Sequence, residues 1–116
     1  MTRPSFNEAE TLLGVHLQEL GLYFKQGYRY VPGRKFEADF AFPDRRLLIE
    51  VQGGIYSRAA HGSITGILAD NERLNLATLN GWGMFRFTPD QVKDGTAIET
   101  IRKALGIGMI LLDREP

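Results

Sequence analysis

The chain contains no cysteine among its 116 residues. Disulfides and thiolate zinc sites are therefore excluded, which fits a reducing compartment such as the cytoplasm. No apolar run approaches the ~20 residues that a membrane-spanning helix needs, so no membrane partner is expected. The first residues, M-T-R-P-S, lack the apolar core of a signal peptide. A phosphate loop of the G-x-x-x-x-G-K-S/T type and an H-E-x-x-H zinc motif are also absent, which leaves a small-molecule phosphohydrolase or an interaction module without positive support.

Charge gives no sign of a strongly basic nucleic-acid binder. Lysine and arginine number 14, aspartate and glutamate also number 14, and the formal net charge is zero. This balance disfavours tight, nonspecific DNA binding by a monomer. It leaves a nuclease open, because acidic residues gathered at a metal site would offset basic residues elsewhere. The length predicts a single domain, 1–116, with one core.

The most informative stretch runs from Phe36 to Gly54. Residues 36–42 alternate in character and predict a strand, and residues 47–52 are nearly continuous in apolar residues, as in a strand buried on both faces. Pro43-Asp44-Arg45-Arg46 between them predicts a turn. One face of the first strand is predicted to carry Phe36, Ala38, Phe40 and Phe42.

Two acidic residues in these strands predict a polar site. Glu50 lies inside the apolar strand, where a carboxylate is costly to bury unless it has a partner such as a divalent metal ion. Gln52 is two residues further on, so its side chain should leave the same face. If the strands pair as a hairpin, Asp39 lies beside Glu50 and the three side chains converge. The alternative is that both acids are half-exposed and pair with Arg34, Arg45 or Arg46.

This pattern resembles the PD-(D/E)XK nuclease superfamily, in which one strand begins with an acid and the next carries an acid, any residue and a lysine. Here the pattern reads Asp39, ten residues, then Glu50-Val51-Gln52. Ala38 replaces the family's proline, and Gln52 replaces the lysine, a variant that the superfamily tolerates. The segments F-x-A-D-F-A-F-P, L-L-I-E-V-Q-G-G-I-Y, D-x-E-R-x-N-x-A-x-L-x-G-W and F-R-F-T are similar to small phage and bacterial nuclease-like proteins, including relatives of the very-short-patch repair endonucleases. The resemblance spans roughly residues 8 to 103.

The resemblance implies an α/β fold with a restriction-endonuclease-like core, a mixed β-sheet of about four or five strands flanked by helices. It also implies a site for Mg²⁺ or Mn²⁺ held by oxygen ligands. The expected ligands are Asp39, Glu50, the backbone carbonyl of Val51 or of Gln52, and an acid from the first helix. Glu10 is the first choice for that acid and Glu8 the second.

The missing lysine leaves the source of positive charge open. Gln52 would orient the attacking water or a phosphate oxygen but carries no charge. Family members that lose the lysine sometimes take a cation from a nearby helix, and Arg73 is the candidate here. The alternative for Arg73 is a local i, i+3 pair with Asp70. Arg86, on a strand beside the motif strands, is expected to face the site or a phosphate.

The remaining elements follow from local patterns. A helix is predicted over residues 6–20, with Ser5 and Glu8 as a capping box, followed by a strand over 22–30 kinked at Gly27. A second helix over 66–80 is expected to turn Ile67, Leu68, Asn71, Leu74, Ala77 and Leu79 inward. A strand over 82–87 leads to a helix that begins with a capping box of Thr88 and Gln91 and continues toward Gly106. Residues 109–112 add a final strand or tail.

Several residues outside the motif are candidates for DNA contact. Arg34 and Lys35, with Arg29, Tyr28 and Tyr30, would form a basic and aromatic edge, or an ordinary solvated hairpin. The glycine-rich loop after Gln52 adds the candidates Tyr56, Arg58 and His61.

These features together predict a metal-dependent DNA endonuclease of the junction or repair type. The alternative is a DNA-binding accessory protein that keeps the fold and has weak or no catalysis, which Gln52 favours. A homodimer would suit the nuclease, because 116 residues offer a small footprint and paired cuts need paired sites.

Overall fold

The computed structural model describes residues 6–52 and 64–107. The chain alternates helices and strands in a mixed α/β arrangement, as expected. The elements are α1 (Phe6–Gln18), β1 (Lys25–Tyr28), β2 (Ala38–Phe42), the 3-10 turn η1 (Pro43–Arg45), β3 (Leu47–Val51), α3 (Ile64–Leu79), β4 (Gly83–Phe87), α4 (Pro89–Lys93) and α5 (Thr96–Leu105). None of the helices in these two ranges is long and apolar enough to cross a membrane.

The sheet has four strands in the order β1-β2-β3-β4. β1, β2 and β3 pair antiparallel, and β3 pairs parallel with β4. The tight η1 turn, closed by Arg46 in the left-handed conformation (φ 53°), permits the antiparallel β2–β3 pair. The parallel β3–β4 pair requires a long crossover, and α3 lies within it. The predicted mixed sheet of four or five strands is thus confirmed with four.

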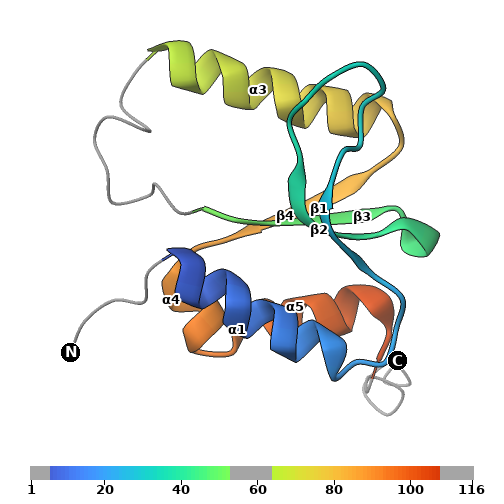
Figure 1. Cartoon of the computed structure of the whole chain (residues 1–116), viewed down its shortest axis with the longest axis vertical. Helices are drawn as coiled ribbons and strands as arrows, with labels where there is room; N and C mark the ends of the chain where they lie inside the picture. The colour runs from blue at the N-terminus through green and yellow to red at the C-terminus, as the bar shows by residue number, and fades with distance from the viewer. Residues whose placement is uncertain (1–5, 53–63, 108–116) are drawn as a thin grey trace, which may run out of the picture.

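Helices cover both faces of the sheet (Figure 1): α1, α4 and α5 lie on one face and α3 on the other. The first face holds the larger core, which includes Leu13, Leu17, Phe40, Ile49 and Ile101. The smaller core under α3 is built from Tyr30, Ala38, Ala41, Leu48, Ala77 and Trp82. Every residue of β3 is buried, which confirms the prediction of a strand covered on both faces.

The predicted apolar face of the 36–42 strand is wrong in its first half. Phe40 and Phe42 pack into the larger core, whereas Phe36 and Ala38 belong to the cluster under α3. The pairing of β2 with β3 covers only Phe40 to Phe42. Before Phe40, Ala38 pairs with Tyr28 of β1, and Phe36 precedes the strand. This segment rises toward α3 (Figure 1), so alternation no longer fixes which side its residues face. The strand expected over 22–30 is likewise short, with the left-handed Gly27 (φ 64°) inside it.

α3 is turned differently from the prediction. Ile67, Leu68 and Leu79 are 49%, 62% and 80% exposed, although an inward position was expected. Ala77 is buried, and Asp70 and Arg73 reach the side chains of the sheet. The sheet presents the charged side chains of Glu50 and Arg86 to this helix. The helix therefore faces the sheet with Asp70, Arg73 and the small Ala77.

The C-terminal helical region begins as predicted but is not one helix. Thr88 and Gln91 form the expected capping box with Pro89 at the first position. Gly95, with φ 90°, then separates α4 from α5. α1 ends at Gln18, slightly before the expected boundary. Ser5 and the segment 109–112 lie outside the described residues.

Candidate active site

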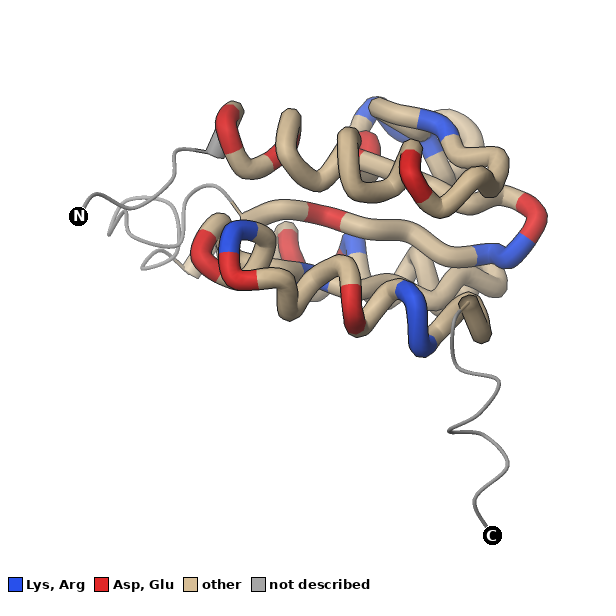
Figure 2. The backbone as a smooth tube through the Cα atoms, turned by 90° about the horizontal axis from the view of Figure 1, so that it is seen from below, with Lys and Arg blue, Asp and Glu red and all other residues tan. Residues whose placement is uncertain are grey.

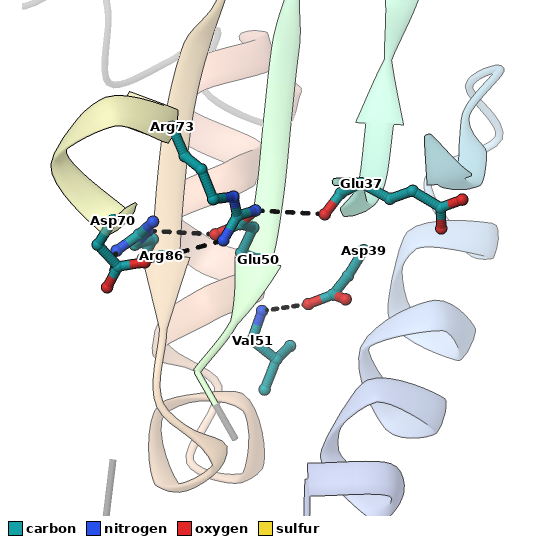
Figure 3. A network of polar contacts seen from close by, with 7 residues as sticks. All are labelled: Glu37, Asp39, Glu50, Val51, Asp70, Arg73 and Arg86. Atoms are coloured by element: carbon teal, nitrogen blue, oxygen red, sulfur yellow. Dashed lines mark hydrogen bonds and ion pairs between the residues drawn. The ribbon is translucent and has the colours of Figure 1, made fainter. Parts of the chain in front are cut away.

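Glu50 is the only buried acidic residue in the described ranges, at 7% exposure. Arg86 stands directly opposite it in the parallel β3–β4 register. The Nε of Arg86 lies 3.2 Å from Glu50 Oε1, and Arg73 from α3 donates a hydrogen bond to Glu50 Oε2. Figure 3 shows both guanidinium groups beside this carboxylate. Each oxygen of Glu50 therefore faces one arginine.

Asp70 closes the arrangement into a network of two acids and two arginines, here called the Glu50 network. Its Oδ2 lies 3.5 Å from Nη1 of Arg86, and its Oδ1 lies 3.9 Å from Nη1 of Arg73. The local Asp70–Arg73 pair that was one alternative is thus present, but as part of a larger set. The two formal negative charges match two positive charges, which is how a protein tolerates ions in a poorly solvated place.

Arg73 is also held from the hairpin side. Its Nη2 donates to the backbone carbonyl of Glu37 at 3.3 Å, and its guanidinium lies 5.4 Å from the centroid of the Phe36 ring. Burial lowers the pKa of Arg73, but the Glu50 carboxylate and the Tyr30 hydroxyl outweigh it, and the net pKa is raised. Arg73 is therefore a fixed cation at the C-terminal end of β3.

Asp39 occupies the neighbouring strand, where the β2–β3 ladder has ended. Its Oδ2 accepts a hydrogen bond of 2.7 Å from the backbone N–H of Val51, in place of a β2 carbonyl (Figure 3). The pKa of Asp39 is raised from 3.8 to about 6, mainly by burial and also by the carboxylates of Glu10 and Glu50, while the Val51 hydrogen bond and the charge of Arg73 act in the opposite direction. The structure thus brings acids from α1, β2 and β3 within electrostatic reach of one another.

These three acids have the donor chemistry that Mg²⁺ or Mn²⁺ prefers. The residues fit such an ion because the mutual repulsion at Asp39 is what a cation would relieve. Glu10, which is half-buried, is the helix acid that acts on Asp39, whereas Glu8 is exposed. Within 6–52 and 64–107, however, no three carboxylates or imidazoles already form a compact metal-binding group. Glu50 faces Arg73 and Arg86, which is consistent with the three carboxylates not being gathered around one point.

The expected alternative partners of Asp39 and Glu50 are wrong. Arg34 instead pairs with Glu72 at 2.7 Å. Arg45 donates to the carbonyl of Leu105 at 3.2 Å, and Arg46 donates to the carbonyl of Asn80. The turn that carries Arg45 and Arg46 is at the opposite end of β3 from Glu50, so neither can reach the buried acid.

The other candidates are divided by the structure. Gln52 follows β3 directly, and its backbone N–H donates to the carbonyl of Phe87 at 2.8 Å, which holds it in line with the strand. Arg34 and Lys35 border a separate groove that Arg46 and Trp82 complete. No sequence signal pointed to Arg46 and Trp82 as groove residues, because they come close to Arg34 and Lys35 only when the hairpin folds over the sheet. Tyr56, Arg58 and His61 lie outside the described residues.

Comparisons with known proteins identify no relative that shares this arrangement of residues. The mixed sheet, the adjacent acids on β2 and β3, and the helix acid all come from the chain itself. No protein-family model, no curated protein and no solved structure matches the chain, so the resemblance to PD-(D/E)XK nucleases stays a prediction based on its own residues.

Proposed function

We propose that the protein is a metal-dependent DNA endonuclease with a restriction-endonuclease-like core. The observation that carries this proposal is that Asp39 and Glu50 lie on adjacent antiparallel strands within electrostatic reach of each other, with Arg73 beside Glu50. Asp39 is fixed by the amide of Val51, one residue after Glu50, so the two acids lie across one strand boundary. Structural ion pairs account for Glu50, whereas the raised pKa of Asp39, caused mainly by burial, marks this residue as a candidate functional group.

The chain supplies the oxygen ligands for a divalent ion. Glu10, Asp39 and Glu50 would hold Mg²⁺ or Mn²⁺ together with the carbonyl of Val51. The bound ion would polarise the scissile phosphate and lower the pKa of a water molecule. Gln52, held in line with β3, is placed to orient that water or a phosphate oxygen.

Two arginines replace the usual lysine as the source of fixed positive charge. Arg73 and Arg86 flank Glu50, and each retains guanidinium N–H groups that make no hydrogen bond with any described residue. When Glu50 turns toward a metal ion, the guanidinium N–H groups that now face its carboxylate would become available for the oxygens of a phosphodiester. A fixed cation of this kind typically contributes a few kcal/mol to a transition state that develops negative charge.

Cleavage of a labelled DNA panel tests the proposal. The panel comprises a linear duplex, a four-way junction, a flap, a mismatch duplex and a single strand, each with Mg²⁺, Mn²⁺ or EDTA. We expect metal-dependent cleavage by the wild type, loss of activity in Glu50→Gln, and normal activity in Glu19→Gln, an exposed glutamate on the chain segment after α1. Cleavage that persists in EDTA or in Glu50→Gln would contradict this assignment.

A second function is favoured by one specific observation. Both oxygens of Glu50 are already neutralised by arginine, an arrangement that needs no metal ion. This fits a DNA-binding accessory protein that keeps the fold without the chemistry. Titration calorimetry with Mn²⁺ separates the two: a nuclease should bind the ion and lose it in Asp39→Ala, whereas an accessory protein should show no heat from either protein.

A further inference from the structure

A groove of about 510 Å³ lies between the 29–35 segment of the hairpin and the start of β4. Its lining includes Tyr28, Arg29, Arg34, Lys35, Arg46 and Trp82. The volume falls in the range of small-ligand sites, roughly 300–1,000 Å³. Its Arg46 and Trp82 end lies away from the Glu50 network, because these residues stand at the beginning of β3 and β4 and Glu50 stands near the end of β3, whereas its Tyr30 side is within electrostatic reach of Arg73.

The groove is positively charged although the chain as a whole is neutral. Four cationic side chains border it, and no Asp or Glu is among its described lining residues. Arg29 and Arg34 have acidic partners on the surface, at 3.7 Å and 2.7 Å respectively. Lys35 and Arg46 form no ion pair with any residue in 6–52 or 64–107, so their charge is uncompensated there. Figure 2 shows that most basic segments gather at the end of the molecule away from the N-terminus.

Aromatic rings line the same groove. Tyr28 packs edge-to-face against Trp82 with ring centroids 5.5 Å apart. The Arg46 guanidinium lies 4.0 Å from the centroid of the Trp82 ring and also donates to the carbonyl of Asn80. Cations that meet phosphates beside rings that stack on bases are the combination by which proteins hold single-stranded nucleic acid.

We propose that this groove binds a single-stranded segment of nucleic acid, with a phosphate at Arg46 and Lys35 and a base against Tyr28. The inference rests on the proposed function only in taking nucleic acid as the ligand. It does not need the carboxylates or a metal ion. A duplex would offer the phosphates but keep its bases stacked, so an unpaired strand uses the whole groove.

Trp82 is the only tryptophan in the chain, so its fluorescence reports on this groove alone. The test titrates the full-length protein in EDTA at low salt with a short oligothymidylate, an oligouridylate of equal length and a matched duplex. We expect a saturable change in Trp82 emission with an unpaired strand, because a phosphate would draw Arg46 away from the indole ring. The tighter of the two unpaired ligands then assigns the groove to DNA or RNA. A duplex that binds as tightly as both strands would overturn the preference for unpaired bases.

Charge-removing variants locate the binding. Arg46→Ala and Lys35→Ala, measured by anisotropy of a labelled oligonucleotide, should each weaken binding about 5- to 10-fold and reduce the salt slope by roughly 0.7 per lost phosphate contact. Arg46 has a left-handed backbone (φ 53°), and alanine bears a similar backbone cost, so the variant mainly removes the side chain. Arg45→Ala is the matched control, because that adjacent arginine contacts Leu105 on the other side of the molecule. Equal affinity of Arg46→Ala and wild type would overturn the proposal.

The groove and the nuclease proposal fail separately. Loss of oligonucleotide binding in Arg46→Ala, with no cleavage by wild type under any metal condition, would support the groove and reject the enzyme. Metal-dependent cleavage lost in Glu50→Gln, with binding unchanged in Arg46→Ala, would do the reverse.

Discussion

At the scale of single residues, Asp39 carries a clear pH signature. The pKa of its carboxyl is raised from 3.8 to about 6 in the folded protein, so the folded state holds a proton that the unfolded state has released. The stability that this residue contributes is therefore present below pH 3.8 and is lost as the pH rises through about 6. The effect is at most ~3 kcal/mol, and solvent screening of this partly exposed carboxyl makes it smaller.

Asp39→Asn should remove this dependence. The asparagine keeps an oxygen for the Val51 N–H but never ionises, so in EDTA we expect the variant to be more stable than wild type above about pH 7. Urea unfolding at about pH 8 and about pH 5 measures the difference, which should shrink by at least ~1 kcal/mol at the lower pH. Asp44→Asn, at an exposed acid in η1, serves as the control. A difference independent of pH would show that Asp39 is not the titrating group.

Glu50 is predicted to be structural as well as functional. Glu50→Ala leaves Arg73 and Arg86 facing each other without their shared acid, and breaking a buried pair in this way costs about 3–5 kcal/mol. Chemical unfolding of Glu50→Ala and Glu50→Gln should place the alanine variant lower, since glutamine still offers an oxygen to one guanidinium. Equal stability of wild type and Glu50→Ala would show that the network contributes nothing net.

At the scale of elements, two glycines have opposite roles. Gly14 lies in the middle of α1, and an added Cβ would meet only the Phe40 ring at an ordinary 3.6 Å. Gly14→Ala should therefore stabilise the protein by ~0.5–1 kcal/mol through helix propensity. Gly95, between α4 and α5, has φ 90°, so Gly95→Ala should destabilise it by ~1–2 kcal/mol although nothing blocks the space. Thermal unfolding of both variants checks the signs, and a stabilising Gly95→Ala would contradict the left-handed linker.

Local patterns predicted the elements whose structure is decided locally. The buried strand β3 and the Thr88 capping box follow from short-range sequence features, whereas the mixed sheet was implied by the family resemblance. The proximity of Asp39 to the Glu50 strand followed from pairing two such strands.

What could not be predicted depends on tertiary contacts. Periodicity placed Ile67 and Leu68 inward on α3, but the sheet offers Glu50 and Arg86 to that helix, and charge complementarity decided its rotation. The Arg86 partner of Glu50 requires the β3–β4 register, which no local signal fixes. The groove at Arg46 and Trp82 requires the hairpin to fold over the sheet, a feature set by the whole chain.

At the scale of the whole molecule, the two faces of the sheet are held by different forces. α1, α4 and α5 share a large apolar core, whereas α3 buries only Ala77, against a smaller cluster, and makes charged contacts through Asp70, Glu72 and Arg73. Regions with few buried apolar contacts open at lower free energy than the core does. Hydrogen exchange should therefore show α3 amides exchanging through a local opening, well before those of β3 and α1. Exchange of α3 and β3 at one common free energy would contradict this expectation.

The weak attachment of α3 gives the molecule a built-in way to change its chemistry without unfolding. Arg73 belongs to that helix, whereas Glu50, Asp39 and Arg86 belong to the sheet. Each departure of α3 would take Arg73 and Asp70 away together and leave Glu50 with Arg86 as its remaining arginine partner in the network. The rate at which α3 opens would then set how often Glu50 and Asp39 become accessible to a metal ion or a nucleic-acid strand.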